Sequence, residues 1–438
     1  MAAFAAAFVR GIDANRTLKD ELTAAIQSQS QRRRISVTDL VNPRQAYFRW
    51  TRTDIRPSPD RAQLMLAGIG FHELFGRAVS TEEFVEQFVE YEGIVGKIDI
   101  YEQVPVELKT TGALPETPQA ARPAHLDQLG MYCTMTGASS GWLLLYRRGQ
   151  IGRPGAFRAF RVQYTASDAV RSEMLRRRDL LREALDRGDP TQLPQCEWFG
   201  RDCDYAEICG CETAPPAARV VPPDGYRIER DEALEGALLA QLSAPDPPPR
   251  GYRLNDLVFP RKSAYERQTP AEEDEPDGAV EARLQELERA GFRGTLYKAL
   301  RFGIPGAFKN RPVRLRTLSD RVGMFRDVPT LLRVTKFREM VERGYLPQAF
   351  GHYFDRLAFE CALTGRERGR LVLYYELLGD KFMVYEVGFR DLPVIAAEAD
   401  RRLALLESNA SPQDLPPCPS WMFRLCRFKD RCGCGDAA

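Results

Sequence analysis

The sequence predicts an α/β protein made of two similar domains in tandem, each a mixed sheet flanked by helices. Three observations lead to this prediction. The 438 residues suit two domains of about 200 residues each. The same four-cysteine tail occurs twice, and the motifs before it recur in the same order. Between these motifs, apolar residues alternate as in strands or recur at the spacing of helices.

The two cysteine tails have the spacings C-x6-C-x5-C-x-C and C-x7-C-x5-C-x-C. A four-cysteine pattern that recurs with one residue of drift indicates a duplication in which each half ends in a metal or iron–sulfur site. Four thiolates suit a 4Fe–4S cluster and a tetrahedral zinc ion equally well. The expected ligands are Cys196, Cys203, Cys209 and Cys211 in the first tail, and Cys418, Cys426, Cys432 and Cys434 in the second.

The repeat extends beyond the cysteines. Asp39–Arg44 matches Asp256–Arg261, and Gln128–Gly137 matches Arg356–Gly365. A strand-like apolar run follows each copy of the second motif. Pro-rich stretches separate the halves and favour an extended connector with one short helix, at 229–242. The expected domains are 1–211, a linker at 212–250, and 251–438.

Periodicity gives the first half its elements in chain order. The apolar segment Met1–Val9 is interrupted early by Arg10 and Asp13, so we expect a short amphipathic helix there. The remaining expected elements are helices at 38–50 and 62–79, a strand within 84–99, a strand at 104–110, a helix at 124–135, strands at 141–147 and 157–164, and a helix at 166–187.

The bulk composition excludes several classes of protein. A net charge of +1 gives no overall attraction to nucleic acid, so any basic surface must be local. No apolar stretch approaches the roughly 20 residues that a membrane span requires. Eight of the ten cysteines lie in the two tails, which is unlike a secreted disulfide protein of this size. We therefore expect reduced thiolates and a cytoplasmic location.

The candidate catalytic residues lie on two neighbouring strands of the first half. Glu107 and Lys109 point to one face because side chains alternate along a strand. A hairpin closing after Tyr101 would bring Asp99 close to Glu107. Two carboxylates, the Leu108 carbonyl and water could ligate Mg2+. The metal would polarise a phosphodiester and activate water, and Lys109 would orient or deprotonate that water.

This pattern is weak alone, because solvated strands often carry Glu and Lys. Three further residues strengthen it. His72 lies on an expected helix and could be another metal ligand, although it could equally be an ordinary core or surface histidine. Gln128 and Tyr132 are four residues apart on a helix and share a face, which helix packing alone would also explain.

In this order, the motifs Gly68–His72, Gly96–Asp99, Glu107–Lys109 and Gln128–Tyr132 resemble those of RecB-like nucleases of the PD-(D/E)xK superfamily. With the cysteine tail, the chain is most similar to the CRISPR-associated iron–sulfur exonuclease family over residues 35–211. The resemblance implies restriction-endonuclease-like domains and metal-dependent cleavage of DNA, often exonucleolytic on single strands.

The resemblance also implies residue roles and cofactors. His72, Asp99 and Glu107 would ligate Mg2+ or Mn2+, Lys109 would be the catalytic lysine, and Gln128 and Tyr132 would support the site. It favours two 4Fe–4S clusters, with two Zn2+ as the alternative. The family carries an early cluster cysteine before a Pro-Arg pair. Here that position holds Asn42 in one half and Phe259 in the other, while each tail gains a final cysteine, Cys211 or Cys434.

The second half lacks these site residues. Aligning its Val-Gly and Val-Pro pairs with the first half places Arg326 opposite Asp99, and the remaining positions are also replaced. Arginine suits phosphate contact, so Arg326, Arg333 and Arg356 are candidate DNA-binding residues. A decayed domain kept for packing is the alternative. The aligned replacements are Leu331 for Glu107, Arg333 for Lys109, Arg356 for Gln128 and Glu360 for Tyr132.

The expected function is a metal-dependent DNA nuclease with one active and one inactive half, trimming DNA ends in defence or repair, for example in CRISPR spacer acquisition. The expected partners are single-stranded or overhanging DNA ends and a CRISPR integrase. The alternatives are a DNA-end-binding adaptor without its own cleavage and a subunit of a helicase–nuclease complex. No Walker-type phosphate loop occurs in the sequence, so any motor would be a separate protein.

Overall fold

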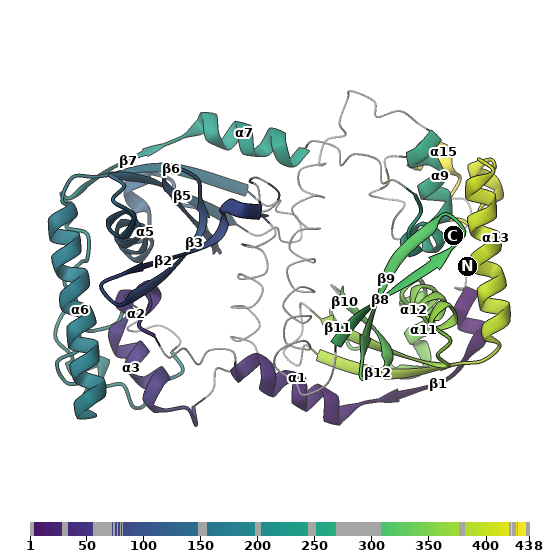
Figure 1. Ribbon diagram of the computed structural model, residues 1–438, viewed down its shortest axis with the longest axis horizontal. Coiled ribbons are helices and arrows are strands. Elements are labelled where there is room, and N and C mark those ends of the chain that lie inside the picture. The colour runs from purple at the N-terminus through teal and green to yellow at the C-terminus, as the bar shows by residue number, and fades with distance from the viewer. Residues whose placement is uncertain are drawn as a thin grey trace. The chain divides into compact units, whose positions relative to one another are not determined.

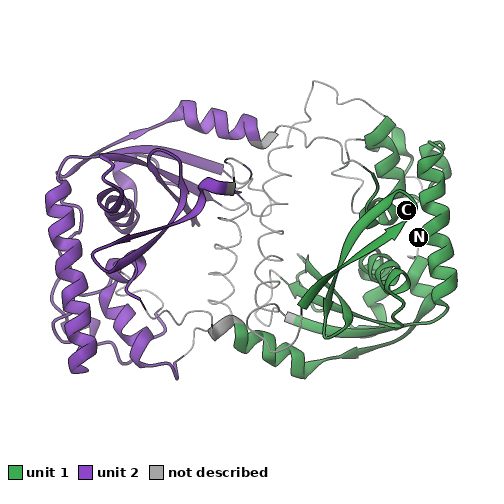
Figure 2. Ribbon diagram, viewed as in Figure 1, with its two compact units in different colours: residues 1–26, 245–277, 296–438 green, residues 27–244, 278–295 purple. Residues whose placement is uncertain are grey.

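The computed structural model describes residues 4–28, 34–55, 72, 75, 76, 78, 80, 82–147, 156–197, 203–243, 251–268, 308–335, 337–375, 382–419, 422, 426 and 428–434. These residues form a mixed α/β structure with two six-stranded sheets (Figure 1). They divide into two compact units (Figure 2). Of the described residues, unit 2 holds 27–243, and unit 1 holds 4–26 together with 251–434.

Unit 2 is built on a mixed sheet with strand order β2-β3-β4-β5-β6-β7. Strands β4 and β5 are parallel, and every other neighbouring pair is antiparallel. Helix α5 packs against β4 and β5, and α6 packs against α5. The bounds are α2 Val37–Val41, α3 Pro43–Thr51, β2 Val85–Tyr91, β3 Ile94–Tyr101, β4 Pro105–Thr111, α5 Pro123–Thr136, β5 Ser140–Arg147, β6 Ala156–Tyr164, α6 Ser167–Arg187, β7 Tyr226–Arg230 and α7 Glu232–Ser243.

Unit 1 repeats this architecture with strand order β8-β9-β10-β11-β12-β1. Its parallel pair is β10 and β11, the counterparts of β4 and β5. Helix α12 packs on these strands as α5 does in unit 2, and α13 packs against α12. The bounds are β1 Val9–Ala14, α1 Arg16–Ser28, α8 Leu254–Val258, α9 Pro260–Gln268, β8 Phe308–Leu315, β9 Leu318–Phe325, β10 Val328–Thr335, α11 Leu346–Ala349, α12 Gly351–Thr364, β11 Arg368–Tyr375, β12 Phe382–Phe389, α13 Leu392–Glu407 and α15 Lys429–Cys432.

Both faces of the unit 2 sheet are covered by apolar side chains. The larger core lies under α5 and α6 and includes Ile98, Leu129 and Leu181. On the other side, Phe75 and Leu108 pack with Tyr146, Phe157 and Leu238, the last of which comes from α7. In unit 1, the equivalent of the larger core gathers side chains from α12, α13 and the chain's N-terminal segment.

The last strand of each sheet comes from the opposite sequence repeat. Val9, the first residue of β1, precedes α2 by the same 28 residues that separate Tyr226 of β7 from α8, so β1 and β7 occupy equivalent sequence positions. Yet β1 pairs antiparallel with β12 in unit 1, and β7 pairs antiparallel with β6 in unit 2. Each repeat therefore gives its first strand to the sheet of the other repeat.

A buried aspartate holds each exchanged segment at the same helical position. Asp127 on α5 accepts hydrogen bonds from the backbone N–H groups of Val220 and Val221, at 3.2 and 2.9 Å. Asp355 on α12 accepts one from Ala5 N–H at 2.8 Å. Both carboxylates are less than one-tenth exposed. Because buried N–H groups need an acceptor, these bonds fix where each exchanged segment enters its unit.

The predicted domain boundaries are therefore wrong at two places. Residues 4–26 belong to unit 1 and not to a domain spanning 1–211. The predicted linker at 212–250 includes β7 and α7, which complete unit 2. Sequence patterns locate strands and helices but carry no signal for the partner of an edge strand, because that choice depends on contacts far apart in the chain.

Three predicted elements also differ in detail. The apolar N-terminal segment forms a short 3-10 turn, Phe4–Phe8, followed directly by β1 and not an amphipathic helix. The helix predicted at 38–50 is two helices, because Pro43 starts a new helix at its first position. The segment 84–99 contains two strands joined by a turn with Glu92 and Gly93 at positive φ. Most of the predicted helix at 62–79, including Gly68, lies outside the described residues.

Replacing Asp355 tests the exchange in unit 1. Asp355→Ala removes the acceptor of Ala5 N–H and should cost about 1–3 kcal/mol, because the N–H stays buried without a partner. Hydrogen–deuterium exchange should accelerate in residues 4–14 and in β12, while β2 to β6 keep their protection. Asp54→Ala, at an exposed carboxylate paired with Arg52, is the control. Equal acceleration in both sheets would contradict this account.

Candidate active site and cysteine segments

Asp99 lies where two strands of unit 2 diverge. Within β3 and β4, both fully described, backbone pairing is confined to Ile100 with Val106 and Tyr101 with Pro105. Beyond these pairs, the Asp99 carboxylate takes the place of a ladder acceptor and receives the N–H of Leu108 at 2.8 Å. Asp99 is thus held next to the last backbone pair, at the point where β3 and β4 begin to separate.

His72 approaches the same carboxylate from the helical segment before β2. Its Nδ1 lies 3.3 Å from Asp99 Oδ1, and both side chains are 17% exposed. The other ring nitrogen, Nε2, is buried and has no hydrogen-bond partner among the described residues. A buried imidazole nitrogen without a partner is uncommon and marks a position that a ligand could fill.

Glu107 and Lys109 contact each other on β4. The Lys109 ammonium lies against Glu107 Oε1, while Glu107 Oε2 is buried and unpartnered among the described residues. The Glu107 side chain is only 1% exposed. Burial raises the pKa of Glu107 to about 8, with the Asp99 charge adding to the rise and the Lys109 charge opposing it.

The other two ionisable groups shift in the direction of their charged forms. Burial alone would raise the pKa of Asp99, but the charges of His72 and Lys109 and the hydrogen bonds from His72 and Leu108 N–H outweigh it, so the pKa falls. Burial alone would lower the pKa of Lys109, but the charges of Glu107 and Asp99 raise it. The site thus contains an ionised Asp99 and Lys109 beside a carboxyl that is readily protonated.

Helix α5 supplies the opposite wall of the site. Gln128 Nε2 donates to Tyr132 Oη at 3.3 Å, and Tyr132 Oη donates to the Lys97 carbonyl on β3 at 3.0 Å. The ring of Tyr132 fits because Gly96 has no side chain: a Cβ there would lie 2.8 Å from Tyr132 Cε1. The glycine of the Gly96–Asp99 motif therefore makes room for the tyrosine of the Gln128–Tyr132 motif.

The sequence reasoning missed His125. It lies on the α5 face of Gln128 and Tyr132, at helical positions i, i+3 and i+7. Its Nδ1 is buried and unpartnered among the described residues. Burial, together with the positive charges of Lys109 and Arg122, lowers the pKa of His125 to about 3. The available signal was that the chain has only three histidines, and one of them shares this helical face.

The structure thus brings the sequence-predicted residues into three contacts: His72 with Asp99, Glu107 with Lys109, and Gln128 with Tyr132. The Leu108 backbone joins the first contact through its N–H. Within the described part of the chain, no three His, Cys, Asp or Glu side chains are arranged to hold a metal ion. Three atoms of the site are buried without a hydrogen-bond partner among the described residues: His72 Nε2, Glu107 Oε2 and His125 Nδ1.

The Pro-Arg pair of each repeat clamps a cysteine segment. In unit 2, Arg44 on α3 donates to the carbonyls of Thr191, Leu193 and Cys209, at 2.7–3.2 Å. In unit 1, Arg261 on α9 is the matching arginine. It donates to the carbonyls of Gln413, Leu415 and Cys432, at 2.8–3.0 Å.

The cysteines of each segment belong to one apolar cluster of their unit, with Cys203, Cys418 and Cys426 at its partly buried margin. In unit 2, three of the four are buried, and none of the ten described cysteines forms a disulfide. Burial, followed by the neighbouring Cys211 thiol, raises the pKa of Cys196. In unit 1, burial and then Cys434 raise the pKa of Cys418 to about 12. Such shifts describe thiols crowded in an apolar setting.

The sheet register corrects the predicted counterpart of Asp99. Val95 N–H donates to Ile35 O in unit 2, and Ser319 N–H donates to Tyr252 O in unit 1, which makes Val95 and Ser319 equivalent. Asp99 lies four residues after Val95, and Gly323 lies four residues after Ser319. The counterpart of Asp99 is therefore Gly323 and not Arg326. Arg326 lies in the β9–β10 turn at positive φ and pairs with Glu21 at 2.7 Å. The two Val-Gly pairs that suggested Arg326 are three residues out of register.

Arg356 is also an unsuitable DNA contact. It is 9% exposed and donates to Glu360 at 2.7 Å and to Asn255 at 3.2 Å, with Asp320 3.3 Å away. Asp320 and Glu360 occupy the positions of Gly96 and Tyr132. The tyrosine site of unit 2 is therefore replaced by a buried ion network in unit 1, which uses the charge of Arg356 internally.

Arg333 keeps the predicted position opposite Lys109. Its guanidinium lies 5.6 Å from the ring centre of Tyr353, which occupies the helical position of His125. The Tyr353 hydroxyl donates to the Val334 carbonyl at 3.1 Å. A cation beside an aromatic ring thus recurs in both units, but unit 1 has no carboxylate at the positions of Asp99 and Glu107, which are Gly323 and Leu331.

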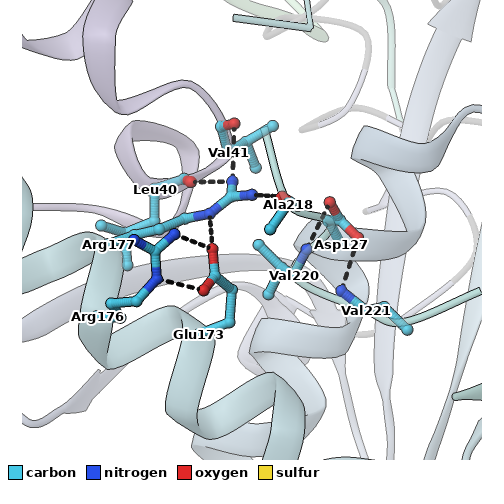
Figure 3. A network of polar contacts seen from close by, with 9 residues as sticks. All are labelled: Leu40, Val41, Asp127, Glu173, Arg176, Arg177, Ala218, Val220 and Val221. Atoms are coloured by element: carbon cyan, nitrogen blue, oxygen red, sulfur yellow. Dashed lines mark hydrogen bonds and ion pairs between the residues drawn. The ribbon is translucent and has the colours of Figure 1, made fainter. Parts of the chain in front are cut away.

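An arginine of helix α6 ties three segments of unit 2 together (Figure 3). Arg177 is 2% exposed and donates to the carbonyls of Leu40, Val41 and Ala218 and to the Glu173 carboxylate. It thereby joins α6, α2 and the segment that leads to the exchanged strand. Beside it, Asp127 holds that segment by the backbone of Val220 and Val221 (Figure 3).

Comparisons with known proteins add little. No family model matches the chain, and no curated protein matches it. Among solved structures, one titled "Crystal structure of SSO0001" is 16% identical, and the match covers 45% of this chain and 96% of that chain with a TM-score of 0.31. A likeness of this size carries no argument about function. Among the described residues, no helix has the length and apolar character needed to cross a membrane.

The shifted histidines predict acid sensitivity of the fold. The ordinary pKa of His125 is 6.5 and its folded pKa is about 3, so the unfolded chain binds the proton more readily between these values. Proton uptake by the unfolded chain therefore lowers the free energy of unfolding. This loss is absent above about pH 6.5 and grows as the pH falls toward 3, at up to about 1.4 kcal/mol per pH unit. His125→Gln should remove it, so urea unfolding of the variant should lose less stability than the wild type between pH 7 and 4.

His352→Gln is the matched variant in unit 1, because burial and the Arg333 charge lower the pKa of His352 to about 4. This variant should also lose less stability than the wild type on acidification, over the narrower pH range from about 6.5 to 4. Stability curves that run parallel to the wild type at every pH would show that these imidazoles titrate normally.

Proposed function

We propose that the chain is a divalent-metal-dependent DNA nuclease whose active site lies in unit 2. The observation that carries the proposal is the joint placement of Asp99, Glu107 and Lys109 on two diverging strands, with buried and unpartnered donor atoms on His72 and Glu107. A protein that only packs or binds would have no use for one buried and one largely covered carboxylate beside a lysine, at this cost in desolvation.

The donor set fits a hard divalent cation. His72, Asp99, Glu107 and the Leu108 carbonyl would hold Mg2+ or Mn2+, because oxygen donors suit these ions and Mn2+ accepts imidazole readily. When bound, the ion would polarise a phosphodiester oxygen and lower the pKa of a water molecule. The unpartnered His72 Nε2 and Glu107 Oε2 are the atoms that such an ion would satisfy.

The other residues have distinct roles in this proposal. Lys109 would orient the attacking water as an ammonium and not act as its base, since the charges of Glu107 and Asp99 raise the pKa of Lys109. Tyr132 and Gln128 fix β3 against α5 through the Lys97 carbonyl, and so position Asp99 two residues later. This chain of bonds explains why the Gln128–Tyr132 motif accompanies the carboxylates.

Unit 1 is inactive in this proposal. It has no carboxylate at either metal position, and its buried Arg356 network occupies the corresponding interior. Its use would be DNA binding or scaffolding within two restriction-endonuclease-like domains. The DNA ends, a CRISPR-type spacer acquisition pathway with its integrase, and a cytoplasmic setting belong to the same proposal, which the family resemblance supports.

Each cysteine segment would hold a 4Fe–4S cluster, with Zn2+ as the alternative. The support is the recurrence of four cysteines behind the same arginine clamp in both units. Because only one unit keeps catalytic residues while both keep the cysteines, the clusters would stabilise the fold and not take part in cleavage. The competing function, a DNA-end-binding adaptor or a helicase–nuclease subunit, predicts binding without metal-dependent cleavage.

Removal of the central carboxylate tests the nuclease proposal. Asp99→Ala and Lys109→Ala should each reduce Mg2+- or Mn2+-dependent cleavage of end-labelled DNA by roughly 100-fold or more, because each removes a group that acts in the reaction. Arg326→Ala, at an exposed turn of unit 1, should cleave like the wild type. Full cleavage by Asp99→Ala would place the chemistry elsewhere, and no cleavage by the wild type would favour the adaptor.

The arginine clamps give a matched test of the clusters. Anaerobically purified wild type should be brown and contain iron for two 4Fe–4S clusters. Arg44→Ala should lose the cluster of unit 2 and keep the other, while Arg261→Ala should do the reverse, so that each variant has about half of the wild-type iron. Two zinc ions in colourless protein would retain the four-thiolate sites and exclude iron–sulfur. Protein without either metal would contradict both.

A further inference from the structure

The β8–β9 hairpin of unit 1 has an unusual concentration of positive charge. Lys309, Arg311 and Arg314 lie on β8, and Arg321 lies on β9; all four side chains are exposed. Pro312 pairs with Arg321 and Arg314 pairs with Ser319, so Arg314 and Arg321 are diagonal neighbours on one face of the hairpin, while Lys309 and Arg311 lie on the other face along the same edge strand. Like charges this close repel each other unless an anion lies between them.

These four cations form no ion pair with any described residue. Other arginines in the same region are paired: Arg316, at the hairpin turn, lies 3.0 Å from Glu407, and Arg326 lies 2.7 Å from Glu21. The one carboxylate on the hairpin strands, Asp320, is directed to the buried Arg356. The protein therefore supplies partners for neighbouring arginines but leaves this set to solvent.

The equivalent hairpin of unit 2 has the opposite sign. Its β2 strand and turn carry Glu86, Glu90 and Glu92, where unit 1 has Asn310, Arg314 and Arg316. Cations beside these carboxylates are used internally, since Lys97 pairs with Glu86, Arg34 with Glu90 and Arg178 with Glu92. The two hairpins share a backbone and differ in charge, so the fold does not require a basic surface here.

Protection of a sheet edge does not explain the difference. Strand β8 is the edge of its sheet, and charged residues and Pro312 discourage pairing with another chain. Strand β2 is the edge of the other sheet and has acidic residues. Positive and negative side chains both protect an edge strand from pairing. Edge protection therefore explains why both strands are charged, but not why β8 is basic where β2 is acidic.

We propose that the β8–β9 hairpin binds the phosphate backbone of DNA. Three of the four side chains are arginines, whose planar fork matches phosphate oxygens. The choice of DNA rests on the proposed nuclease function; the binding itself does not, because it needs no metal and no catalytic residue. The sequence-predicted DNA contacts Arg326 and Arg356 are thereby replaced by Lys309, Arg311, Arg314 and Arg321.

The test is a salt titration of DNA binding by the full-length chain. The variant replaces Lys309, Arg311, Arg314 and Arg321 with Gln. A matched control makes the same charge change on α6 of unit 2, where Arg171, Arg176, Arg182 and Arg187 are exposed. Both sets are made in the Asp99→Ala background and measured with EDTA on a labelled 30-base-pair duplex, so that cleavage has no part in the result. Thermal melts confirm that both variants fold.

The hairpin variant should bind roughly tenfold or more weakly at low salt, and its log–log salt slope should be less steep by about 0.9 per lost contact, or about 0.7 on single strands. The α6 control should retain wild-type affinity and slope. Equal losses in both variants would show a mere effect of net charge and overturn the proposal. So would unchanged binding by the hairpin variant, or a loss confined to RNA of the same length.

Discussion

Each unit depends on one buried carboxylate that captures the backbone of an exchanged segment. Asp127 and Asp355 occupy the same position on the central helix and accept N–H groups from Val220 and Val221 or from Ala5. The sixth strand of each sheet follows directly from these anchors. Because the strand and its sheet come from different repeats, neither repeat completes a six-stranded sheet by itself.

The two units share a fold but have different polar side chains between the sheet and the central helix. In unit 2, Gly96 admits the Tyr132 ring, and Asp99 occupies the gap between diverging strands. In unit 1, the replacements are coupled: Asp320 fills the glycine position, and Glu360 and Arg356 complete a buried network with it. A buried charge needs a partner, so losing the tyrosine required several changes together. With these partners in place, the interior of unit 1 remains well packed.

The Pro-Arg motif connects the helical core with the cysteine segments. Arg44 and Arg261 donate to carbonyls on both sides of their cysteines, and they do so with nearly the same set of bonds. Proline sets the helix start, and the next residue then projects toward the segment. Each cysteine segment is thus hydrogen-bonded to an arginine that lies more than 140 positions earlier in the sequence.

The sequence by itself determined the duplication, the mixed α/β class, most strand and helix positions, and the candidate residues Asp99, Glu107 and Lys109, because these depend on local periodicity and spacing. Tertiary structure decided which sheet takes β1 and β7, that Gly323 and not Arg326 replaces Asp99, and that His125 joins the site. Strand partners and register are set by long-range pairing and buried hydrogen bonds, which short matching motifs do not encode.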